Sequence, residues 1–297
     1  MRLPDFIIIG APKSATTTLV SCLRKHPQIF ISTPKEIGYF SRDYLYERGL
    51  DWYSNFFKEA KPEQVCGEAS TEYSGNLDRT NTVERMYSAI PNIKLLYLMR
   101  HPVDRAYSHY LHKMRALELQ GKIKSGQGIT FEDAIEEHKE ILDFSHYIKQ
   151  INRYLSVFSR SSFHFALTDD FIGNIDEELV AIYDFLGIDK YPKQLDMAVE
   201  KHYSKTILNE SVTRSKALQP LRSMPGYRQI LNFFPKEVKD RIYEFVKNSF
   251  YGNLIEKQRF IPFPMLPETR QHLLNLFSGS NQELSCFLGR DLSAWSR

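Results

Sequence analysis

The chain has 297 residues, of which 42% are hydrophobic and 25% are charged. A chain of this length can bury a large core as one domain or two small ones, without disulfides. Its net charge of +3 is too small to indicate a nucleic-acid-binding protein, so any anion site must be local.

The cysteines and the apolar runs bear on the cellular compartment of the protein. Cys22, Cys66 and Cys286 lie far apart and form neither a CxxC pair nor a Cys/His cluster, which argues against a disulfide framework or structural zinc. No leader-like segment precedes the first apolar run, and no run reaches the roughly 18 residues that suggest a membrane span. We therefore expect a cytoplasmic protein without a membrane partner.

Short apolar runs alternate with segments of helical periodicity along the first two thirds of the chain. The runs that predict buried strands are Phe6 to Gly10, Val65 to Glu68, Lys94 to Met99 and Phe163 to Leu167. The segments that predict helices are Thr17 to Lys25, Val83 to Ala89, Val103 to Leu117, Thr130 to Leu142, Ser145 to Phe158 and Glu177 to Phe185. This order predicts an α/β fold, with a parallel sheet flanked by helices on both faces.

The last third has a different character. A polar, basic segment runs from Lys201 to Arg222, and helices are predicted at Lys236 to Ser249 and Gln282 to Leu288. Pro262, Pro264 and Pro267 predict a loop before the last helices. Because no linker-like stretch divides the chain, we expect one domain over residues 1–297 with C-terminal helical additions.

The stretch FIIIGAPKSATTTL, residues 6–19, joins the first predicted strand to the first helix. A strand that ends in glycine and turns directly into a helix presents unpaired N–H groups and the positive end of the helix dipole. Lys13 adds a full charge, and Thr16, Thr17 and Thr18 add hydroxyl donors, which favours a phosphate-like anion. The plainer alternative is a connection in which a threonine caps the helix and Lys13 is solvated.

This turn differs from the GxxxxGK[ST] loop of nucleoside-triphosphate enzymes. Lys13 follows Gly10 by only three residues, and no Gly-Lys-Ser or Gly-Lys-Thr comes after it. The third predicted strand ends in Met99-Arg100-His101-Pro102, where an acidic residue would help to hold Mg²⁺. We therefore expect an anionic nucleotide that is bound without a required metal.

The segment Gly10-Ala11-Pro12-Lys13-Ser14-Ala15-Thr16-Thr17-Thr18-Leu19 resembles the 5′-phosphosulfate loop of the sulfotransferases that use 3′-phosphoadenosine 5′-phosphosulfate (PAPS). It is most similar to the heparan sulfate sulfotransferase-like branch and its bacterial relatives. Leu98 to Tyr110 is similar to the family's 3′-phosphate segment, in which a strand ends in Arg and the next helix carries Ser. The resemblance implies a P-loop-like sulfotransferase fold with PAPS as cofactor, Lys13 to Thr18 around the phosphosulfate, and Arg100 and Ser108 on the 3′-phosphate.

Further matches in the family's order extend the resemblance over essentially the whole chain. They are Thr33 to Phe40, Gly67 to Ser70, Phe131 to Ala134 and Leu288 to Leu292. Glu36 stands where the family has its catalytic glutamate, which implies that it is the general base for an acceptor hydroxyl. Lys13 is implied to neutralise the leaving phosphate. Without the resemblance, Glu36 would be an ordinary solvated carboxylate beside Lys35.

Two basic residues are open to two interpretations. His112 lies four residues after Ser108, on the same helical face. It resembles a histidine that the N-sulfotransferase members use, or it is a helix histidine satisfied by a neighbour. Arg214 lies in a segment that closes over the nucleotide in relatives, or it belongs to a surface charge run.

The residues after the second predicted strand are equally open. Glu68, Ser70 and Tyr73 either line the acceptor pocket or have core or capping roles. Tyr147 and Trp52 are expected to be packing residues rather than ligands.

Two positions depart from the family's pattern and bear on the acceptor. Ala15 stands where the family usually has glycine, which costs about 1 kcal/mol or more if its φ is positive. Ala69 stands where glycan-modifying members often carry a lysine, which speaks against a polyanionic glycan. We expect a small-molecule or carrier-bound acceptor, such as a metabolite of secondary metabolism, sulfated on O or N. The rival functions are a nucleotide kinase and a PAPS-binding module without catalysis.

Overall fold

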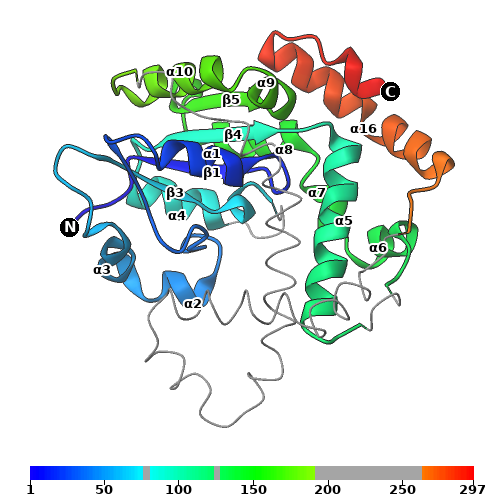
Figure 1. The fold of residues 1–297 in the computed structure, drawn as a ribbon, viewed down its shortest axis with the longest axis horizontal. Coiled ribbons are helices and arrows are strands. Elements are labelled where there is room, and N and C mark those ends of the chain that lie inside the picture. Colours follow the sequence, from blue (N-terminus) through cyan, green and yellow to red (C-terminus); the bar gives the residue numbers. More distant parts are fainter. Residues whose placement is uncertain (76–80, 124–127, 191–262) are drawn as a thin grey trace, which may run out of the picture. The chain divides into compact units, whose positions relative to one another are not determined.

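The computed structural model describes residues 1–75, 81–123, 128–190 and 263–297 (Figure 1). The chain divides into two compact units, Met1–Tyr110, Phe131–Leu195 and Met265–Arg297 in the first, and Leu111–Thr130 and Asp196–Pro264 in the second. The predicted helix from Lys236 to Ser249 and the basic segment from Lys201 to Arg222 lie outside the described residues. The expectation of one domain over the whole chain stays a prediction.

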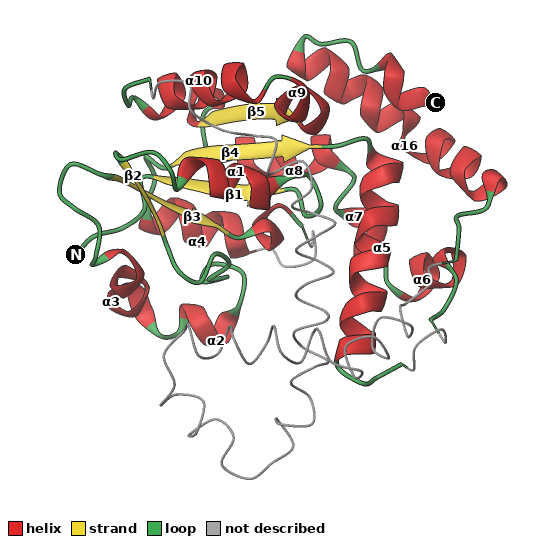
Figure 2. Ribbon diagram, viewed as in Figure 1, coloured by secondary structure: helices red, strands yellow, loops and turns green. Residues whose placement is uncertain are grey.

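The first unit is built on one parallel sheet with the strand order β2-β3-β1-β4-β5 (Figure 2). The strands are β1 (Phe6–Gly10), β2 (Ile29–Ile31), β3 (Val65–Ala69), β4 (Lys94–Met99) and β5 (Phe163–Leu167). All four pairings are parallel. The sequence predicted four of these strands, and it missed the three-residue β2.

Helices cover both faces of this sheet, as the sequence predicts. Alternate strand residues point to opposite faces, and the odd-numbered Ile7, Ile9 and Leu95 join one core cluster with residues of α4 (Asn81–Ala89) and α8 (Tyr147–Leu155). The strand β1 is buried at every residue. The helix α1 (Thr16–Leu23) lies in front of the sheet in Figure 2 and α8 lies behind it.

The remaining helices surround this core or extend from it. They are α2 (Asp43–Tyr46), α3 (Gly49–Ser54), α5 (Pro102–Leu119), α6 (Phe131–Glu137), α7 (Glu140–Asp143), α9 (Thr168–Gly173), α10 (Ile175–Leu186) and α16 (Pro267–Leu288). Short 3₁₀ turns are η1 (Asn55–Phe57), η2 (Thr71–Ser74), η3 (Arg160–Ser162) and η5 (Ser293–Ser296). After Tyr110, α5 continues into the second unit. Among the described helices, none combines the length and hydrophobicity that crossing a bilayer requires.

Two helix predictions differ from the structure. The predicted helix from Thr130 to Leu142 is two helices, α6 and α7, which are separated at His138 and Lys139. There the amide of Ile141 donates three residues back, to the carbonyl of His138, which makes a tighter turn than an α-helix. Pro267 is the first residue of α16 rather than part of a loop. Proline suits that place, because the first N–H groups of a helix have no intrahelical partner.

Candidate active site

The turn between β1 and α1 is built to expose backbone N–H groups. Lys13 and Ala15 have left-handed φ values of 69° and 62°, and Ala15 is the N-cap of α1 without a side-chain capping bond. Left-handed residues in such a turn direct N–H groups into one concavity that suits anions. For a residue with a Cβ, this conformation costs roughly 1 kcal/mol or more. The turn therefore has a stored conformational cost at the position where the family usually has glycine.

The hydroxyl groups of this turn differ in exposure. Ser14 is fully buried, and its Oγ has no hydrogen bond of regular geometry among the described residues, although it lies near the hydroxyl of Tyr147. Thr16 is 4% exposed, Thr17 is exposed and Thr18 is half-buried. Leaving a buried donor unpaired is costly. A phosphate-like oxygen would satisfy the Ser14 hydroxyl, so these residues fit an anionic group.

Arg100 follows β4 and borders the same turn. Its guanidinium donates to the backbone oxygen of Lys13 at 3.5 Å. The hydroxyl of Tyr147 donates to the Arg100 carbonyl at 2.7 Å and accepts from the Arg100 amide at 3.3 Å. Burial raises the pKa of Tyr147 to about 12, so the hydroxyl keeps its proton. The expectation that Tyr147 only packs is incomplete, because its hydroxyl holds the backbone of Arg100.

Ser108 is half-buried on α5, and a buried arginine precedes it on the same helix. Arg105 is fully buried. It donates to Ser145 Oγ at 2.6 Å and to the carbonyl of Ile141, which ties α5 to the segment before α8. Burial lowers the pKa of Arg105 to about 10, so it remains charged at neutral pH. No local sequence pattern indicates this role, because the partners of Arg105 lie 36 and 40 residues away.

Glu36 lies at the edge of the sheet where β3 ends. Its Oε1 accepts from Thr71 Oγ1 at 3.2 Å and from Lys35 Nζ at 3.1 Å, and its side chain is 48% exposed. The amide of Ala69, the last residue of β3, donates to the carbonyl of Lys35 at 3.4 Å. Because the strands are parallel, the ends of β1, β3 and β4 meet at one edge. Glu36, Lys13 and Arg100 therefore share this carboxyl edge of the sheet.

Other predicted site residues lie elsewhere. His112 is exposed and belongs to the second unit, and Arg214 lies outside the described residues. Their roles stay predictions. Glu68, Ser70 and Tyr73 are all fully buried, so they belong to the core beneath the site.

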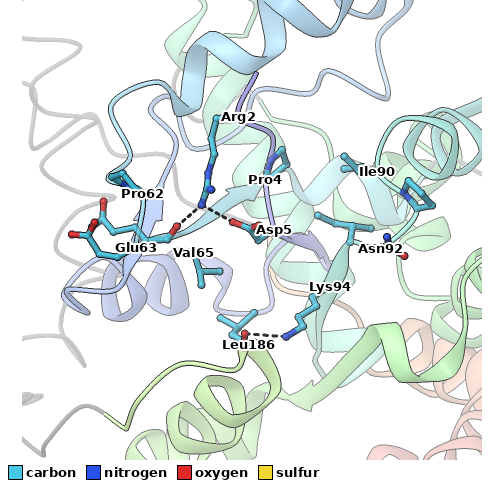
Figure 3. A pocket seen from close by; sticks show the side chains of 13 residues that line it. Arg2, Pro4, Asp5, Pro62, Glu63, Val65, Ile90, Asn92, Lys94 and Leu186 are labelled. Carbon is cyan, nitrogen blue, oxygen red and sulfur yellow. Dashed lines mark hydrogen bonds and ion pairs between the residues drawn. The ribbon is translucent and has the colours of Figure 1, made fainter.

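A hollow lies at the opposite, amino edge of the sheet, where β1, β3 and β4 begin (Figure 3). Its volume is about 570 Å³. Arg2 donates to Asp5 Oδ2 at 3.1 Å and to the carbonyl of Gln64. Lys94 donates to the carbonyl of Leu186 at 2.9 Å. Both cations are already bound to groups of the chain itself.

Comparisons with known proteins identify the family of the chain. A model of the sulfotransferase domain matches residues 3–250. The chain is 28% identical over 320 residues to a membrane-associated sulfotransferase, kil1, of Dictyostelium discoideum, covering 97% of the chain and 66% of that protein. It is 29% identical over 192 residues to heparan sulfate glucosamine 3-O-sulfotransferase 5 of Mus musculus, covering 63% of the chain and 54% of the relative.

A solved structure is similar over the full length of both chains. It is a sulfotransferase from Alicyclobacillus acidocaldarius, with a TM-score of 0.65 and 23% sequence identity. That similarity confirms the predicted P-loop-like sulfotransferase fold. Because the family model covers more than half of the sequence, the chain belongs to the family of PAPS-dependent sulfotransferases.

Proposed function

We propose that the protein transfers a sulfuryl group from PAPS to a hydroxyl of a small-molecule or carrier-bound acceptor, with Glu36 as general base. One observation carries the proposal: an exposed carboxylate and an anion-binding turn with a buried, unsatisfied hydroxyl share one edge of the sheet. PAPS supplies the activated sulfuryl group and its leaving phosphate. An amine acceptor would use the same arrangement.

The turn residues would hold the 5′-phosphosulfate. The N–H groups at the start of α1 and the side chains of Lys13, Ser14 and Thr16 to Thr18 offer donors to its oxygens. Ala15 would contribute only its backbone. The guanidinium of Arg100 would bind the 3′-phosphate, with Ser108 as a second donor.

Glu36 would accept the proton of the acceptor hydroxyl. Among the described residues, both bonds to this carboxylate fall on Oε1, so Oε2 is the oxygen that would face the acceptor. As the acceptor oxygen bonds to sulfur, the bond from sulfur to the 5′-phosphate oxygen breaks, and that oxygen keeps the electron pair. Lys13 would stabilise the charge that develops there. His112 would be a second base, and Arg214 would close on the nucleotide.

The expected test is Glu36→Gln. An alcohol does not ionise beforehand, and general base catalysis is worth on the order of 10²- to 10⁴-fold, so turnover should fall more than about 100-fold. Binding of adenosine 3′,5′-bisphosphate (PAP), measured by calorimetry, should stay unchanged. Transfer is followed with sulfur-labelled PAPS and a panel of alcohols, phenols and amines.

The matched control is Glu63→Gln, which removes one carboxylate from the amino edge and should leave both measurements unchanged. Near-normal turnover in Glu36→Gln would contradict the assignment. PAP binding without transfer by the unaltered protein would favour the inactive module. Loss of activity in EDTA would favour the kinase, which the missing Gly-Lys-Ser/Thr and the family comparison speak against.

We also propose a cytoplasmic location. All three cysteines are free, which suits a reducing compartment. The buried Ala69, where glycan-modifying members often have lysine, supports an acceptor other than a polyanionic glycan.

A further inference from the structure

Glu68 is a carboxylate enclosed beneath the candidate active site. It lies in β3 and is fully buried. Among the described residues no lysine or arginine pairs with it, and it accepts bonds from the hydroxyls of Tyr53, Ser70 and Tyr73. Burial raises the pKa of this carboxyl, whereas the three hydroxyl bonds and the nearby backbone amide of Gly38 act in the opposite direction. A buried carboxylate is costly to keep, so its place needs an explanation other than packing.

The two oxygens of Glu68 hold different parts of the chain. Its Oε1 accepts from Ser70 Oγ at 2.5 Å and from the Tyr73 hydroxyl at 2.8 Å. Its Oε2 accepts from the hydroxyl of Tyr53, on α3. Removing one hydroxyl at a time therefore tests the two oxygens separately.

The hydroxyls on Oε1 continue to the segment that carries Glu36. Ser70 Oγ accepts from the amide of Gly38 at 3.0 Å, and the Tyr73 hydroxyl accepts from the amide of Phe40 at 3.3 Å. Each hydroxyl gives its single hydrogen to Glu68, which leaves its lone pairs for an amide. Because Glu68 accepts both hydroxyl hydrogens, each hydroxyl in turn accepts a hydrogen bond from a backbone amide.

The anchored backbone has little freedom to move. Gly38 has a φ of +71°, and a Cβ there would come within 2.4 Å of Glu72 Oε1. Gly38 is the second residue after Glu36, so only Ile37 lies between the anchored amide and Glu36. The orientation of the Glu36 carboxylate therefore depends on the Gly38 and Phe40 amides.

We propose that Glu68 is a positioning residue: through Ser70 and Tyr73 its Oε1 holds the Gly38 and Phe40 amides and so fixes the segment that presents Glu36. The catalytic consequence rests on the proposed role of Glu36. Positioning of catalytic groups carries a large share of such rate enhancements, so a looser segment lowers turnover without touching the nucleotide site.

The test compares Ser70→Ala with Tyr53→Phe, which each remove one hydroxyl from Glu68. Tyr53→Phe keeps the ring that stacks on Tyr39 at 4.4 Å. Hydrogen exchange of the peptide that contains residues 36–40, followed by mass spectrometry, should be about tenfold faster in Ser70→Ala, as expected for one lost hydrogen bond, and unchanged in Tyr53→Phe. Turnover with the best acceptor of the panel should fall about tenfold in Ser70→Ala only, with PAP affinity within about twofold.

Glu68→Gln and Tyr73→Phe are further variants of the same network. If Glu68→Gln does not fold, Ser70→Ala still tests the proposal. Equal exchange and equal turnover in Ser70→Ala and Tyr53→Phe would overturn the proposal. If the unaltered protein transfers no sulfate but the exchange difference is found, the positioning stands and the proposed function fails. If transfer occurs and exchange does not respond, the positioning fails and the proposed function stands.

Discussion

The two edges of the sheet differ in how the hydrogen-bonding groups that lie there are satisfied. At the amino edge, the hollow of about 570 Å³ is lined by Arg2 and Lys94, whose bonds go to Asp5 and to backbone carbonyls. At the carboxyl edge, a fully buried Ser14 hydroxyl has no regular bond among the described residues. The proposed binding site therefore rests on an unsatisfied donor in a strained turn and not on the size of a hollow.

The parallel topology gives this difference a physical cause. Helix α1 begins directly after β1, so its N-terminus and partial positive charge lie at the carboxyl edge. Helix α10 ends at Leu186, whose carbonyl lies at the amino edge and accepts from Lys94. The carboxyl edge thus combines the N-terminus of a helix with an unsatisfied hydroxyl, whereas the amino edge holds cations that bind groups of the chain itself.

Of the substitutions that compare the two edges, Arg100→Ala is expected to have the largest effect on PAP affinity. Hydrogen bonds to charged groups contribute about 1.5–3 kcal/mol, so Arg100→Ala should weaken PAP binding about 10- to 100-fold. Lys94→Met removes a cation from the amino edge and should change PAP affinity by less than about twofold. Calorimetric titration of both variants measures this, and an equal loss in both would mean that general charge, rather than a local site, attracts the nucleotide.

A smaller loss of PAP affinity is expected when Arg100 is kept and the hydrogen bonds to its backbone are removed. Tyr147→Phe removes two bonds to the Arg100 backbone, each worth about 1 kcal/mol, so PAP affinity should fall about tenfold. Tyr154→Phe is the matched control, because its buried hydroxyl donates to the Tyr73 carbonyl at 3.0 Å. It should lower the unfolding midpoint in denaturant without changing PAP affinity. Unchanged affinity in Tyr147→Phe would remove Tyr147 from the site.

Local patterns predicted the scaffold of the carboxyl edge. β1, β4 and β5 have the predicted ends, because each is a run of mainly apolar, buried or half-buried residues bounded by a polar or turning segment. Residues 29–31 of β2 are too few to display a periodicity, and within the described part of the chain they pair with β3 alone. The bond from Arg105 to the Ile141 carbonyl of α7 spans 36 residues, and no local pattern contains such a contact.

The residues of the candidate site likewise fall into those that a local motif predicts and those that only the fold brings together. Lys13 and Arg100 stand in short motifs, so the sequence predicted both, and the structure places them 3.5 Å apart through the Lys13 carbonyl. The hydroxyl of Tyr147 reaches Arg100 across 47 residues, and Ser70 reaches Gly38 across 32. These supporting contacts follow from the packing of α8 and η2 against the sheet, which only the fold reveals.

The smallest effect is expected from Ala15→Gly, which changes the backbone strain of the turn at the carboxyl edge and leaves its charge unchanged. At a φ of 62° the methyl group costs roughly 1–2 kcal/mol, whereas glycine adds about 0.4–1 kcal/mol of unfolded-state entropy. Ala15→Gly should therefore raise the free energy of unfolding by about 0.5 kcal/mol, with PAP affinity equal or better. Ala89→Gly, in α4 and without a positive φ, should instead lose about 0.5–1 kcal/mol. Denaturant unfolding and PAP titration of both variants measure this. A marked loss of PAP affinity in Ala15→Gly would mean that the Ala15 methyl group supports nucleotide binding, either by contact or by restricting the backbone of the turn.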